Sequence, residues 1–546
     1  MAQKQLLLGD EALALGALHA GLSGVYAYPG TPSTEITEFI QSYPFAAERK
    51  VHCSWSANEK TAMESALGMS FAGKRALVCM KHVGMNVCAD PFMGSATTGA
   101  NGGLVVAACD DPSMHSSQNE QDSRFWGTFA LVPVFEPSSQ QETYEMVRYA
   151  FDYSEKRGIP VLMRLTTRMA HSRAAVECIA DADAKAQNGL KLPENERQWC
   201  TLPVCAKVRY NQLVKDYAQF ERDAVESPFN RLEDGPDKSL GIIACGIGYN
   251  YLMENYPDGC PHPVLKISQY PFPKELIIKL SRMCEKILVI EEGQPVVEER
   301  MRGVFESGVT VLGRLSGALP RTGELSPDCV REALGLPALK QHPAAKTLAP
   351  RPPALCQGCG HRDLFTALNN VMKDYPNGRA FSDIGCYTLG WLPPFEAIQT
   401  CVEMGASVTM AQGAAYSGLW PAVAVIGDST FTHSGMTGLL DAVNENADVT
   451  ICISDNLTTG MTGGQDSAGT GRLEAICAAM GVDPAHIRTF EPLPKNYPEM
   501  EKVLREEIEY HGVSVIISRR ECLQTLRRHA KQVPPPRGGV SGGGNV

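Results

Sequence analysis

The sequence has no long hydrophobic run and no excess of positive charge. No stretch approaches the roughly 20 apolar residues that a helix needs to span a bilayer, so we expect no transmembrane helix. The apolar run at residues 6–8 is too short for a secretory signal, which favours a cytoplasmic protein. The formal net charge of −11 provides no basic surface for nucleic acid, and we predict that the chain binds none.

The sequence also gives little reason to expect disulfide bonds, although it contains 18 cysteines. Proteins of the cytoplasm keep their cysteines as free thiols or as metal ligands. Most of these cysteines stand alone within apolar segments, as Cys79 and Cys452 do, and we interpret them as small buried hydrophobic residues. Only cysteines with a regular spacing are therefore candidates for chemistry.

The length of 546 residues predicts about three domains. Short apolar runs alternate with alanine-rich stretches, which is typical of a doubly wound parallel sheet, so we expect three doubly wound α/β domains. The expected boundaries are 1–190, 191–339 and 354–532, with a linker rich in alanine and proline at 340–353 and a disordered tail at 533–546.

Within these domains the apolar runs predict individual elements. The expected strands include 24–28, 75–80, 103–108 and 159–164 in the first domain, with a helix at 62–72, and 240–245 and 286–290 in the second. Residues 187–231 show no clear hydrophobic period, so we expect a connecting region there.

Oxygen-bearing side chains follow two strands expected in the third domain. The strand at 423–426 ends in Gly427-Asp428-Ser429, and the strand at 449–453 is followed by Asp455-Asn456, with a helix expected at 436–446 between them. Carboxylate and amide oxygens are suitable ligands for Mg²⁺, so Asp428 and Asn456 are candidate ligands. By itself, Gly-Asp is also a common turn at the end of a strand.

These residues resemble the thiamine-diphosphate signature, in which Gly-Asp-Gly is followed about thirty residues later by Asn-Asn. The resemblance implies that Gly427, Asp428, Ser429 and Asn456 bind the cofactor and its Mg²⁺, and that the backbone carbonyl of Thr458 is a third metal ligand. Serine replaces the last glycine and aspartate replaces the first asparagine, but both side-chain ligand positions are retained.

A thiamine cofactor also requires a carboxylate that hydrogen-bonds the aminopyrimidine ring and favours its reactive tautomer. Glu59 opens an alanine-rich segment that resembles the cofactor-activating helix of 2-oxoacid oxidoreductases, and we predict that it has this role. An acidic residue in the first turn of a helix is equally expected from capping and from the helix dipole.

Two further segments resemble the active-site loops of the same enzymes. Residues 29–33 resemble a turn that contacts substrate, and residues 110–124 resemble a second active-site loop. Thr31 could donate a hydrogen bond to a 2-oxoacid carboxylate and Arg124 could pair with it. Alternatively, either residue simply stabilises a turn.

Four cysteines of the third domain have the pattern of metal ligands. Cys356 and Cys359 have the C-x₂-C spacing that lets two thiolates reach one metal centre, and Cys386 and Cys522 follow strand-like segments of the same domain. The four could converge at one edge of the sheet. A structural zinc site and unligated buried cysteines are the competing interpretations.

The run Cys356-Gln-Gly-Cys-Gly-His-Arg362, followed by Gly385-Cys386-Tyr387 and the thiamine signature, resembles the large subunit of indolepyruvate:ferredoxin oxidoreductases over nearly the whole chain. The resemblance implies pyrimidine-binding, transketolase-C-like and diphosphate-binding domains in that order. It also implies that Cys356, Cys359, Cys386 and Cys522 hold a [4Fe–4S] cluster.

The implied activity is oxidative decarboxylation of an aryl 2-oxoacid to an acyl-coenzyme A, as in anaerobic metabolism. The implied partners are a smaller beta subunit and ferredoxin or another electron acceptor, in a dimer of heterodimers. Longer relatives end in a two-cluster ferredoxin domain, whereas this chain has no cysteine after Cys522. The rival hypotheses are a non-oxidative thiamine-dependent decarboxylase or carboligase, and a scaffold or electron carrier that has lost its cofactor.

Overall fold

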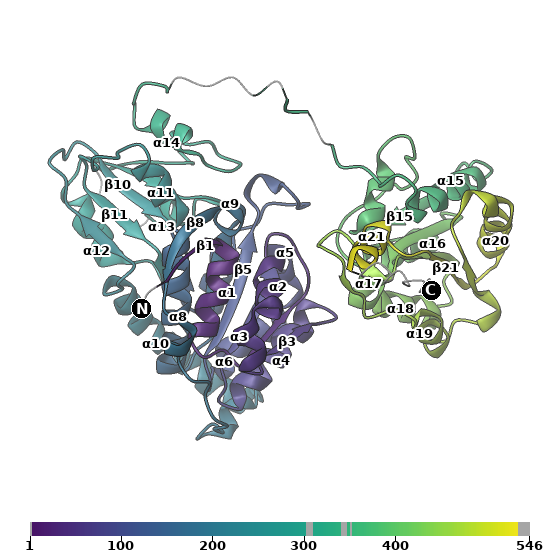
Figure 1. Cartoon of the computed structure of the whole chain (residues 1–546), viewed down its shortest axis with the longest axis horizontal. Helices are drawn as coiled ribbons and strands as arrows, with labels where there is room; N and C mark the ends of the chain where they lie inside the picture. Colours follow the sequence, from purple (N-terminus) through teal and green to yellow (C-terminus); the bar gives the residue numbers. More distant parts are fainter. Residues whose placement is uncertain (1–2, 302–308, 340–344, 346, 350–351, 533–546) are drawn as a thin grey trace, which may run out of the picture. The chain divides into compact units, whose positions relative to one another are not determined.

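The structure is a computed structural model that describes residues 3–301, 309–339, 345, 347–349 and 352–532. It divides into two compact units, Met1–Ala344 and Ala345–Val546, and the boundary falls inside the linker predicted at 340–353 (Figure 1). The tail predicted at 533–546 lies outside the described residues, as does part of the linker.

The first unit contains a seven-stranded sheet in the order β12-β6-β7-β5-β4-β2-β3. All of its neighbouring strands are parallel except β12, which pairs antiparallel with β6 at one edge. The bounds are β2 (Gly24–Ala27), β3 (His52–Trp55), β4 (Ala76–Lys81), β5 (Leu104–Asp110), β6 (Val134–Phe135), β7 (Val161–Thr166) and β12 (Gln269–Tyr270). The four strands predicted for the first domain are confirmed as β2, β4, β5 and β7.

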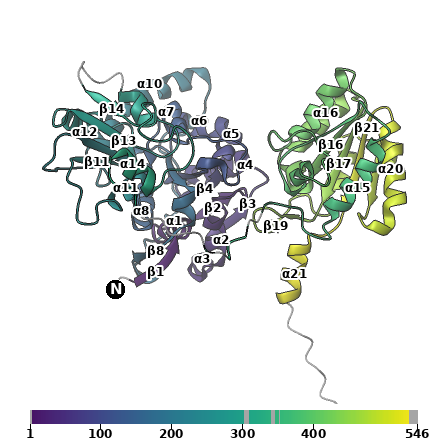
Figure 2. The same ribbon diagram turned by 90° about the horizontal axis from the view of Figure 1, so that it is seen from above.

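Helices surround this sheet (Figure 2). They cover its central strands β4, β5 and β7, which are therefore buried along their whole length, as is typical of parallel sheets. The helix predicted at 62–72 is confirmed as α4. The helices are α1 (Gly9–His19), α2 (Thr34–Ser42), α3 (Pro44–Glu48), α4 (Glu59–Phe71), α5 (His82–Val87), α6 (Ala89–Thr98), α7 (Arg124–Ala130), α8 (Gln140–Arg157) and α9 (Thr167–His171). A separate antiparallel pair joins β1 (Gln3–Leu8) to β8 (Arg173–Cys178).

A five-stranded sheet in the order β14-β13-β10-β11-β9 follows in the same unit, with β9 antiparallel to β11 and the other pairs parallel. The strands predicted at 240–245 and 286–290 are confirmed as β10 and β13. The bounds are β9 (Arg231–Glu233), β10 (Gly241–Cys245), β11 (Val264–Ile267), β13 (Lys286–Ile290), β14 (Thr310–Leu312), α11 (Ile247–Met253), α12 (Lys274–Ser281), α13 (Val296–Met301) and α14 (Pro327–Ala333).

The segments predicted as the first two domains are closely joined. The short strand β12 comes from the second segment but completes the first sheet, and one hydrophobic cluster contains residues of both sheets, such as Phe135 and Ile243. A domain boundary near residue 190 therefore does not coincide with a boundary between compact units.

The connecting region predicted at 187–231 contains a long helix, α10 (Pro203–Val225), which the sequence pattern did not indicate. Its fully buried residues are only Leu213, Phe220 and Ala224, while Val204 and Val208 are exposed. A helix that buries so narrow a face has a weak hydrophobic period, which explains why the sequence pattern did not predict it.

The second unit contains a five-stranded, all-parallel sheet in the order β15-β16-β17-β21-β20. The predicted elements at 423–426, 449–453 and 436–446 are confirmed as β16, β17 and α18. The bounds are β15 (Arg379–Ser382), β16 (Ala422–Gly427), β17 (Val449–Asp455), β20 (Ile487–Phe490), β21 (Val513–Arg519), α15 (Gly360–Met372), α16 (Ala406–Tyr416), α17 (Asp428–Thr430), α18 (Met436–Asn444), α19 (Leu473–Ala479), α20 (Tyr497–Glu509) and α21 (Leu523–Gln532). A short antiparallel pair joins β18 (Thr458–Thr459) to β19 (Gln465–Asp466).

Alternate residues of each central strand face opposite sides of this sheet and form two cores. On β16, Val423 and Val425 pack with residues of α15 and α20, whereas Ala424 and Ile426 pack with residues of α16, α18 and α19. The chain is therefore α/β with parallel sheets, as predicted, and the carboxyl ends of β15, β16, β17 and β21 meet at one edge.

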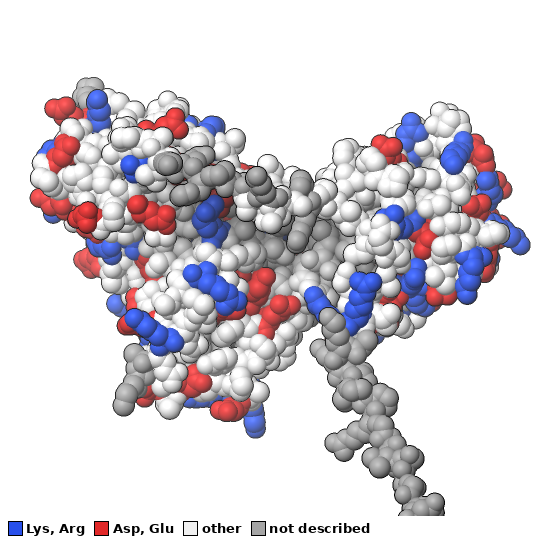
Figure 3. Space-filling model, turned by 45° about the horizontal axis from the view of Figure 1, so that its top comes forward, with Lys and Arg blue, Asp and Glu red and all other residues white. Residues whose placement is uncertain are grey.

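Acidic and basic side chains are interspersed on the face of each unit seen in Figure 3. Neither sign of charge forms a continuous field among the described residues on that face. No helix in the described ranges combines the length and the apolar character that crossing a bilayer requires.

Candidate functional site

In the second unit, Asp428 lies where β16 turns into α17, and it is only 2% exposed. Its Oδ2 atom has no hydrogen-bond partner among the described residues, although the nearby Ser467 hydroxyl, which also has none, acts to lower the pKa of this carboxyl. Burial raises the pKa of Asp428 to about 7, and the nearby carboxylate of Asp455 adds to this effect. A buried carboxylate oxygen without a donor is a position that a bound cation would satisfy.

The other predicted ligands lie at the end of the neighbouring strand. β16 and β17 are parallel, with Gly427 opposite Ser454, so Asp428 and Asn456 follow adjacent strand ends. The backbone N–H of Asn456 acts on the Asp428 carboxylate and lowers its pKa, which shows that the two residues are close. The side chain of Asn456 turns back so that its Oδ1 accepts from the N–H of Thr458 at 3.2 Å. The structure thus brings Asp428, Asn456 and Thr458 together.

Two neighbouring residues hold this arrangement. The Asp455 carboxylate accepts from Arg519 Nε at 2.6 Å and from the N–H of Leu457 at 3.2 Å, so it is already occupied within the protein. The Ser429 hydroxyl lies 2.9 Å from Thr459 Oγ1 and connects the two strand-end segments. The substitutions seen in the signature, serine and aspartate, therefore have structural partners of their own.

The four predicted cysteine ligands also come together in the second unit. Cys356 and Cys359 precede α15, Cys386 follows β15, and Cys522 follows β21. Burial is the main cause that raises the pKa of Cys386 to about 12, and the nearby thiols of Cys359, Cys522 and Cys356 contribute to this shift. Burial likewise raises the pKa of Cys359, with further contributions from Cys356 and Cys522. Each of these thiols is therefore near enough to the others to affect the pKa of its neighbours.

The cysteine cluster adjoins the segment that carries the predicted Mg²⁺ ligands. The N–H of Cys522 donates to the carbonyl oxygen of Asn456 at 3.1 Å. A Cβ on Gly460 would lie 3.2 Å from Cys386 Sγ and 3.5 Å from Asn456 Nδ2, so the glycine leaves the thiol and the amide side by side. The two predicted centres therefore share Asn456 as a neighbour.

The spacing of the four sulfurs bears on the metal they suit. No three of them, judged over the described residues, lie within 4.8 Å of one another. A tetrahedral zinc ion with Zn–S bonds of about 2.3 Å would hold its sulfurs about 3.8 Å apart. The four sulfurs, as they lie in this structure, are therefore not spaced for a single tetrahedral zinc ion.

Two residues beside the cysteines were not predicted from the sequence. His361 is buried, its Nδ1 lies 3.0 Å from Cys359 Sγ, and burial lowers its pKa to about 4, so the ring is neutral at physiological pH. Asp383 is buried at the end of β15 and accepts hydrogen bonds from the Tyr387 and Ser407 hydroxyls. It thereby holds the turn that carries Cys386. In the sequence, the position of Asp383 directly after a strand was the only feature that could have indicated this role.

In the first unit, Glu59 is the first residue of α4 and its side chain is buried. Asn58 caps this helix, because its Oδ1 accepts from the N–H of Thr61 at 2.9 Å. A Cβ on Gly84 would lie only 2.7 Å from Glu59 Cγ and Oε1, so the glycine lets the Glu59 carboxylate lie against α5. Since the capping role is filled by Asn58, the structural alternative for Glu59 is weakened.

The two loops predicted to contact substrate are joined through Ser116. Its hydroxyl donates to the Thr31 carbonyl oxygen at 3.3 Å, and Lys81 Nζ donates to the Ser116 carbonyl and hydroxyl at 2.8 and 3.1 Å. Burial lowers the pKa of Lys81 to about 8. The ammonium group of Lys81 therefore lies beside the Thr31 turn, and the sequence analysis did not identify it. The available signal was its position as the last residue of β4, at the sheet edge where α/β folds place ligands.

Arg124 lies among buried carboxylates of the first unit. Its guanidinium is 1% exposed and donates to Asp122 on its own loop and to Glu291 Oε2 at 2.8 Å. The Arg164 guanidinium lies beside it and pairs with Asp110 and Glu136. Arg124 thus belongs to a buried ion network that joins the two sheets of the first unit, and this placement argues against direct contact with substrate.

We expect Arg124→Leu to lower the free energy of unfolding of the first unit by about 3–5 kcal/mol, because Glu291 would be left buried without a counter-charge and Asp122 would keep only Arg164, at 3.6 Å. The matched control is Arg168→Leu, which removes a 43% exposed partner of Glu324 and should cost at most about 1 kcal/mol. Scanning calorimetry of the full chain would measure both. Equal, small losses would show that Arg124 does not hold the network together.

Comparison with known proteins assigns both units to one class. Residues 15–227 match the pyruvate flavodoxin/ferredoxin oxidoreductase, thiamine diphosphate-binding family, and residues 383–518 match the thiamine pyrophosphate enzyme, C-terminal TPP-binding domain. The chain is therefore a thiamine-diphosphate-binding protein of the 2-oxoacid oxidoreductase class. The first match contains Glu59 and the second contains Asp428 and Asn456.

Full-length relatives define the family within that class. The chain is 39% identical to indolepyruvate oxidoreductase subunit IorA of Archaeoglobus fulgidus, over 95% of this chain and 86% of the relative. It is 37% identical to the subunit of the same name from Pyrococcus abyssi, over 97% and 88%. The chain belongs to the indolepyruvate oxidoreductase subunit IorA family, which confirms the resemblance predicted from its motifs. A chain of the 2-oxoglutarate:ferredoxin oxidoreductase from Magnetococcus marinus aligns over 61% of this chain and 65% of its own length, with a TM-score of 0.49 and 14% identity.

Proposed function

We propose that this chain is the thiamine-diphosphate-binding subunit of an enzyme that oxidatively decarboxylates an aryl 2-oxoacid such as indolepyruvate. The observation that carries the proposal is the position of four thiols directly beside the segment that presents Asn456. A decarboxylase that only releases carbon dioxide and an aldehyde has no use for an electron acceptor there. The family of the chain supports the same conclusion, because its relatives are named as subunits of indolepyruvate oxidoreductases.

The residues at the strand ends of the second unit fit the diphosphate end of the cofactor. Mg²⁺ would be held by the Asp428 carboxylate, Asn456 Oδ1 and the Thr458 carbonyl, with Gly427 and Ser429 beside it. The unpartnered Asp428 Oδ2 supports this assignment, because a divalent cation would neutralise and coordinate it. When bound, thiamine diphosphate supplies the nucleophilic carbon and the electron sink that decarboxylation of a 2-oxoacid requires.

In the first unit, Glu59 would activate the aminopyrimidine ring of the cofactor and the Thr31 turn would bind the substrate. The Glu59 carboxylate would hold a proton at the aminopyrimidine ring nitrogen, and the burial of this side chain would strengthen that hydrogen bond. The Thr31 hydroxyl and the Lys81 ammonium are suited to orient the substrate carboxylate. Lys81 takes the place that the sequence had suggested for Arg124.

Cys356, Cys359, Cys386 and Cys522 would hold a [4Fe–4S] cluster, which supplies a one-electron acceptor close to the cofactor. His361 lies against Cys359 as a neutral ring and would keep water away from this ligand. Coenzyme A would accept the acyl group. Electrons would pass to ferredoxin or another acceptor, and a smaller beta subunit would complete a cytoplasmic, oxygen-sensitive dimer of heterodimers.

The test is reduction of a viologen dye by the anaerobically purified complex with indolepyruvate and coenzyme A. We expect reduction that depends on both substrates. The Glu59→Gln variant should still bind thiamine diphosphate but should lose about 10²- to 10⁴-fold in turnover, because an amide cannot hold the proton that a carboxylate holds. Glu64→Gln, an exposed carboxylate on the same helix, is the matched control and should retain turnover.

Two outcomes would contradict the proposal. Release of the aldehyde without dye reduction by a complex with full iron content would indicate the non-oxidative decarboxylase. Full turnover by Glu59→Gln would show that another group activates the cofactor.

A further inference from the structure

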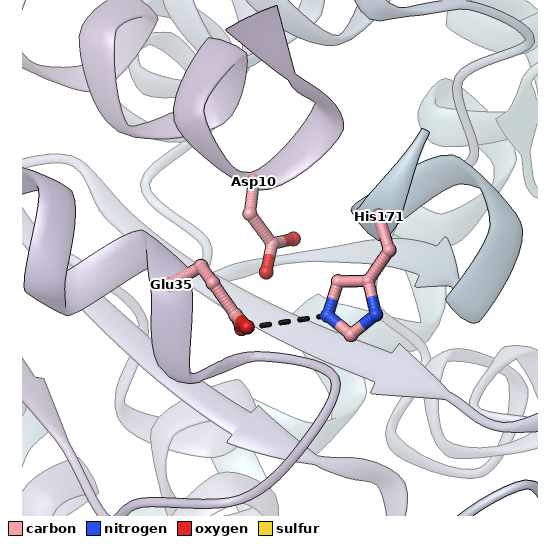
Figure 4. Close-up of side chains that lie close together, drawn as sticks. All are labelled: Asp10, Glu35 and His171. Carbon is pink, nitrogen blue, oxygen red and sulfur yellow. Dashed lines mark ion pairs between the residues drawn. The ribbon is translucent and has the colours of Figure 1, made fainter. Parts of the chain in front are cut away.

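Three potential metal ligands from separate helices meet in the first unit, and none of them has been assigned a role above. Asp10 lies in the first turn of α1, Glu35 in the first turn of α2, and His171 is the last residue of α9. One ligand atom from each residue lies within 4.8 Å of the other two. Figure 4 shows the Asp10 carboxylate pointing from α1 toward the Glu35 carboxylate and the His171 ring, which are 3.4 Å apart.

The Asp10 carboxylate is buried, with the residue 0% exposed, and makes no hydrogen bond within the described part of the chain. The usual function of an acidic residue at a helix start is performed by Glu11, whose Oε2 accepts from the N–H of Leu8 at 2.8 Å. Burial raises the pKa of Asp10, and the carboxylate of Glu35 raises it further. A buried carboxylate in this position is costly unless a positive charge compensates it.

The cluster is closed on the Asp10 side and open on the other. The side chains of Glu35 and His171 are 36% and 33% exposed, so an ion could enter from solvent and complete its coordination with water. Two carboxylates and one imidazole combine the ligands preferred by hard cations with the ligand preferred by zinc and its neighbours in the first transition row. This set suits Zn²⁺ with three protein ligands and an open position.

We propose that Asp10, Glu35 and His171 bind one Zn²⁺ ion that ties α1, α2 and α9 together. The site is distinct from the Mg²⁺ and iron–sulfur ligands, which lie in the second unit. α2 begins directly after the turn at residues 29–33, so an ion on Glu35 would also anchor the turn that contains Thr31. The ion would stabilise this part of the first unit.

The test compares metal content in the full-length protein after equilibrium dialysis against Zn²⁺. Wild type should hold about one equivalent more than each of Asp10→Asn, Glu35→Gln and His171→Gln, because a site with three protein ligands loses its affinity with any one of them. Using the difference between proteins removes any zinc held by the cysteines, so the result does not depend on the proposed function. Glu11→Gln is the control, since it neutralises the neighbouring carboxylate without touching the cluster.

Two further readouts keep the test decisive. Zn²⁺ should raise the thermal unfolding temperature of wild type and Glu11→Gln but not of the three variants. Co²⁺ at this site should give the weak visible absorption bands that are typical of oxygen and nitrogen ligands. These bands should disappear in Glu35→Gln and His171→Gln. Both side chains are partly exposed, so we expect these two variants to fold. Equal zinc content in wild type and all three variants would overturn the proposal.

Discussion

Replacing Asp428 with alanine is expected to abolish Mg²⁺-dependent binding of thiamine diphosphate. The change removes a charged oxygen ligand, which leaves Mg²⁺ short of both coordination and charge compensation. Replacing residues that only support the metal ligands lowers metal affinity by about 10- to 100-fold. Because Asp428 is itself a proposed ligand, we expect its replacement to lower the affinity for the cofactor by more than about 100-fold. Titration calorimetry of the cofactor in the presence of Mg²⁺ would measure it.

The same variant separates binding from folding. Asp428 Oδ2 is buried without a partner, so the apoprotein should unfold at the same or a higher temperature once the carboxylate is removed. Asp441→Ala, an exposed carboxylate on α18 in the same unit, should leave both binding and stability unchanged. Unaltered cofactor affinity in Asp428→Ala would show that the metal is held elsewhere.

Serine replacement of any one of Cys356, Cys359, Cys386 and Cys522 is expected to remove iron from the protein and to abolish dye reduction. A cluster that loses one thiolate has an iron open to water and oxygen, and its potential shifts even where some iron remains. Thiamine-diphosphate binding should largely survive, because Asp428 and Asn456 are untouched. Iron and sulfide assays, together with the EPR spectrum of the reduced protein, would measure the loss.

Cys452→Ser provides the control for this series. Cys452 lies in the core of β17 with no exposed surface and is not part of the cysteine cluster. We expect the hydroxyl to cost about 1–3 kcal/mol of stability through polar burial, with iron content unchanged. If the four variants keep their iron and their dye reduction, the ligand assignment is wrong and the oxidative reaction loses its main support.

Much of the fold was predictable because parallel strands buried on both faces have a simple signature. β4, β5, β13, β16 and β17 are short, nearly continuous apolar runs, and all were predicted within one or two residues. The opposite case is α10, where only Leu213, Phe220 and Ala224 are fully buried. Hydrophobic periodicity reports burial rather than helix formation, so a helix that buries little of its surface gives almost no signal.

Arg124 shows a second limit of reasoning from sequence. A loop arginine near two aspartates is equally compatible with a substrate-binding cation and with a structural ion pair. The choice depends on Glu291, which is distant in sequence but within hydrogen-bond distance in the structure. Lys81 illustrates the reverse case, because its proximity to the Thr31 turn depends on Ser116 from a third segment.

The sequence by itself determined the family, the parallel α/β architecture and the strand-end residues Asp428 and Asn456, because these depend on local patterns and on the rule that parallel strands end at one edge. Only the tertiary structure decided which separate segments meet. It placed the four thiols beside Asn456, buried Arg124 among carboxylates, and brought Asp10 to Glu35 and His171. Contacts between distant segments follow from how helices pack around a sheet, and no local pattern along the chain specifies that packing.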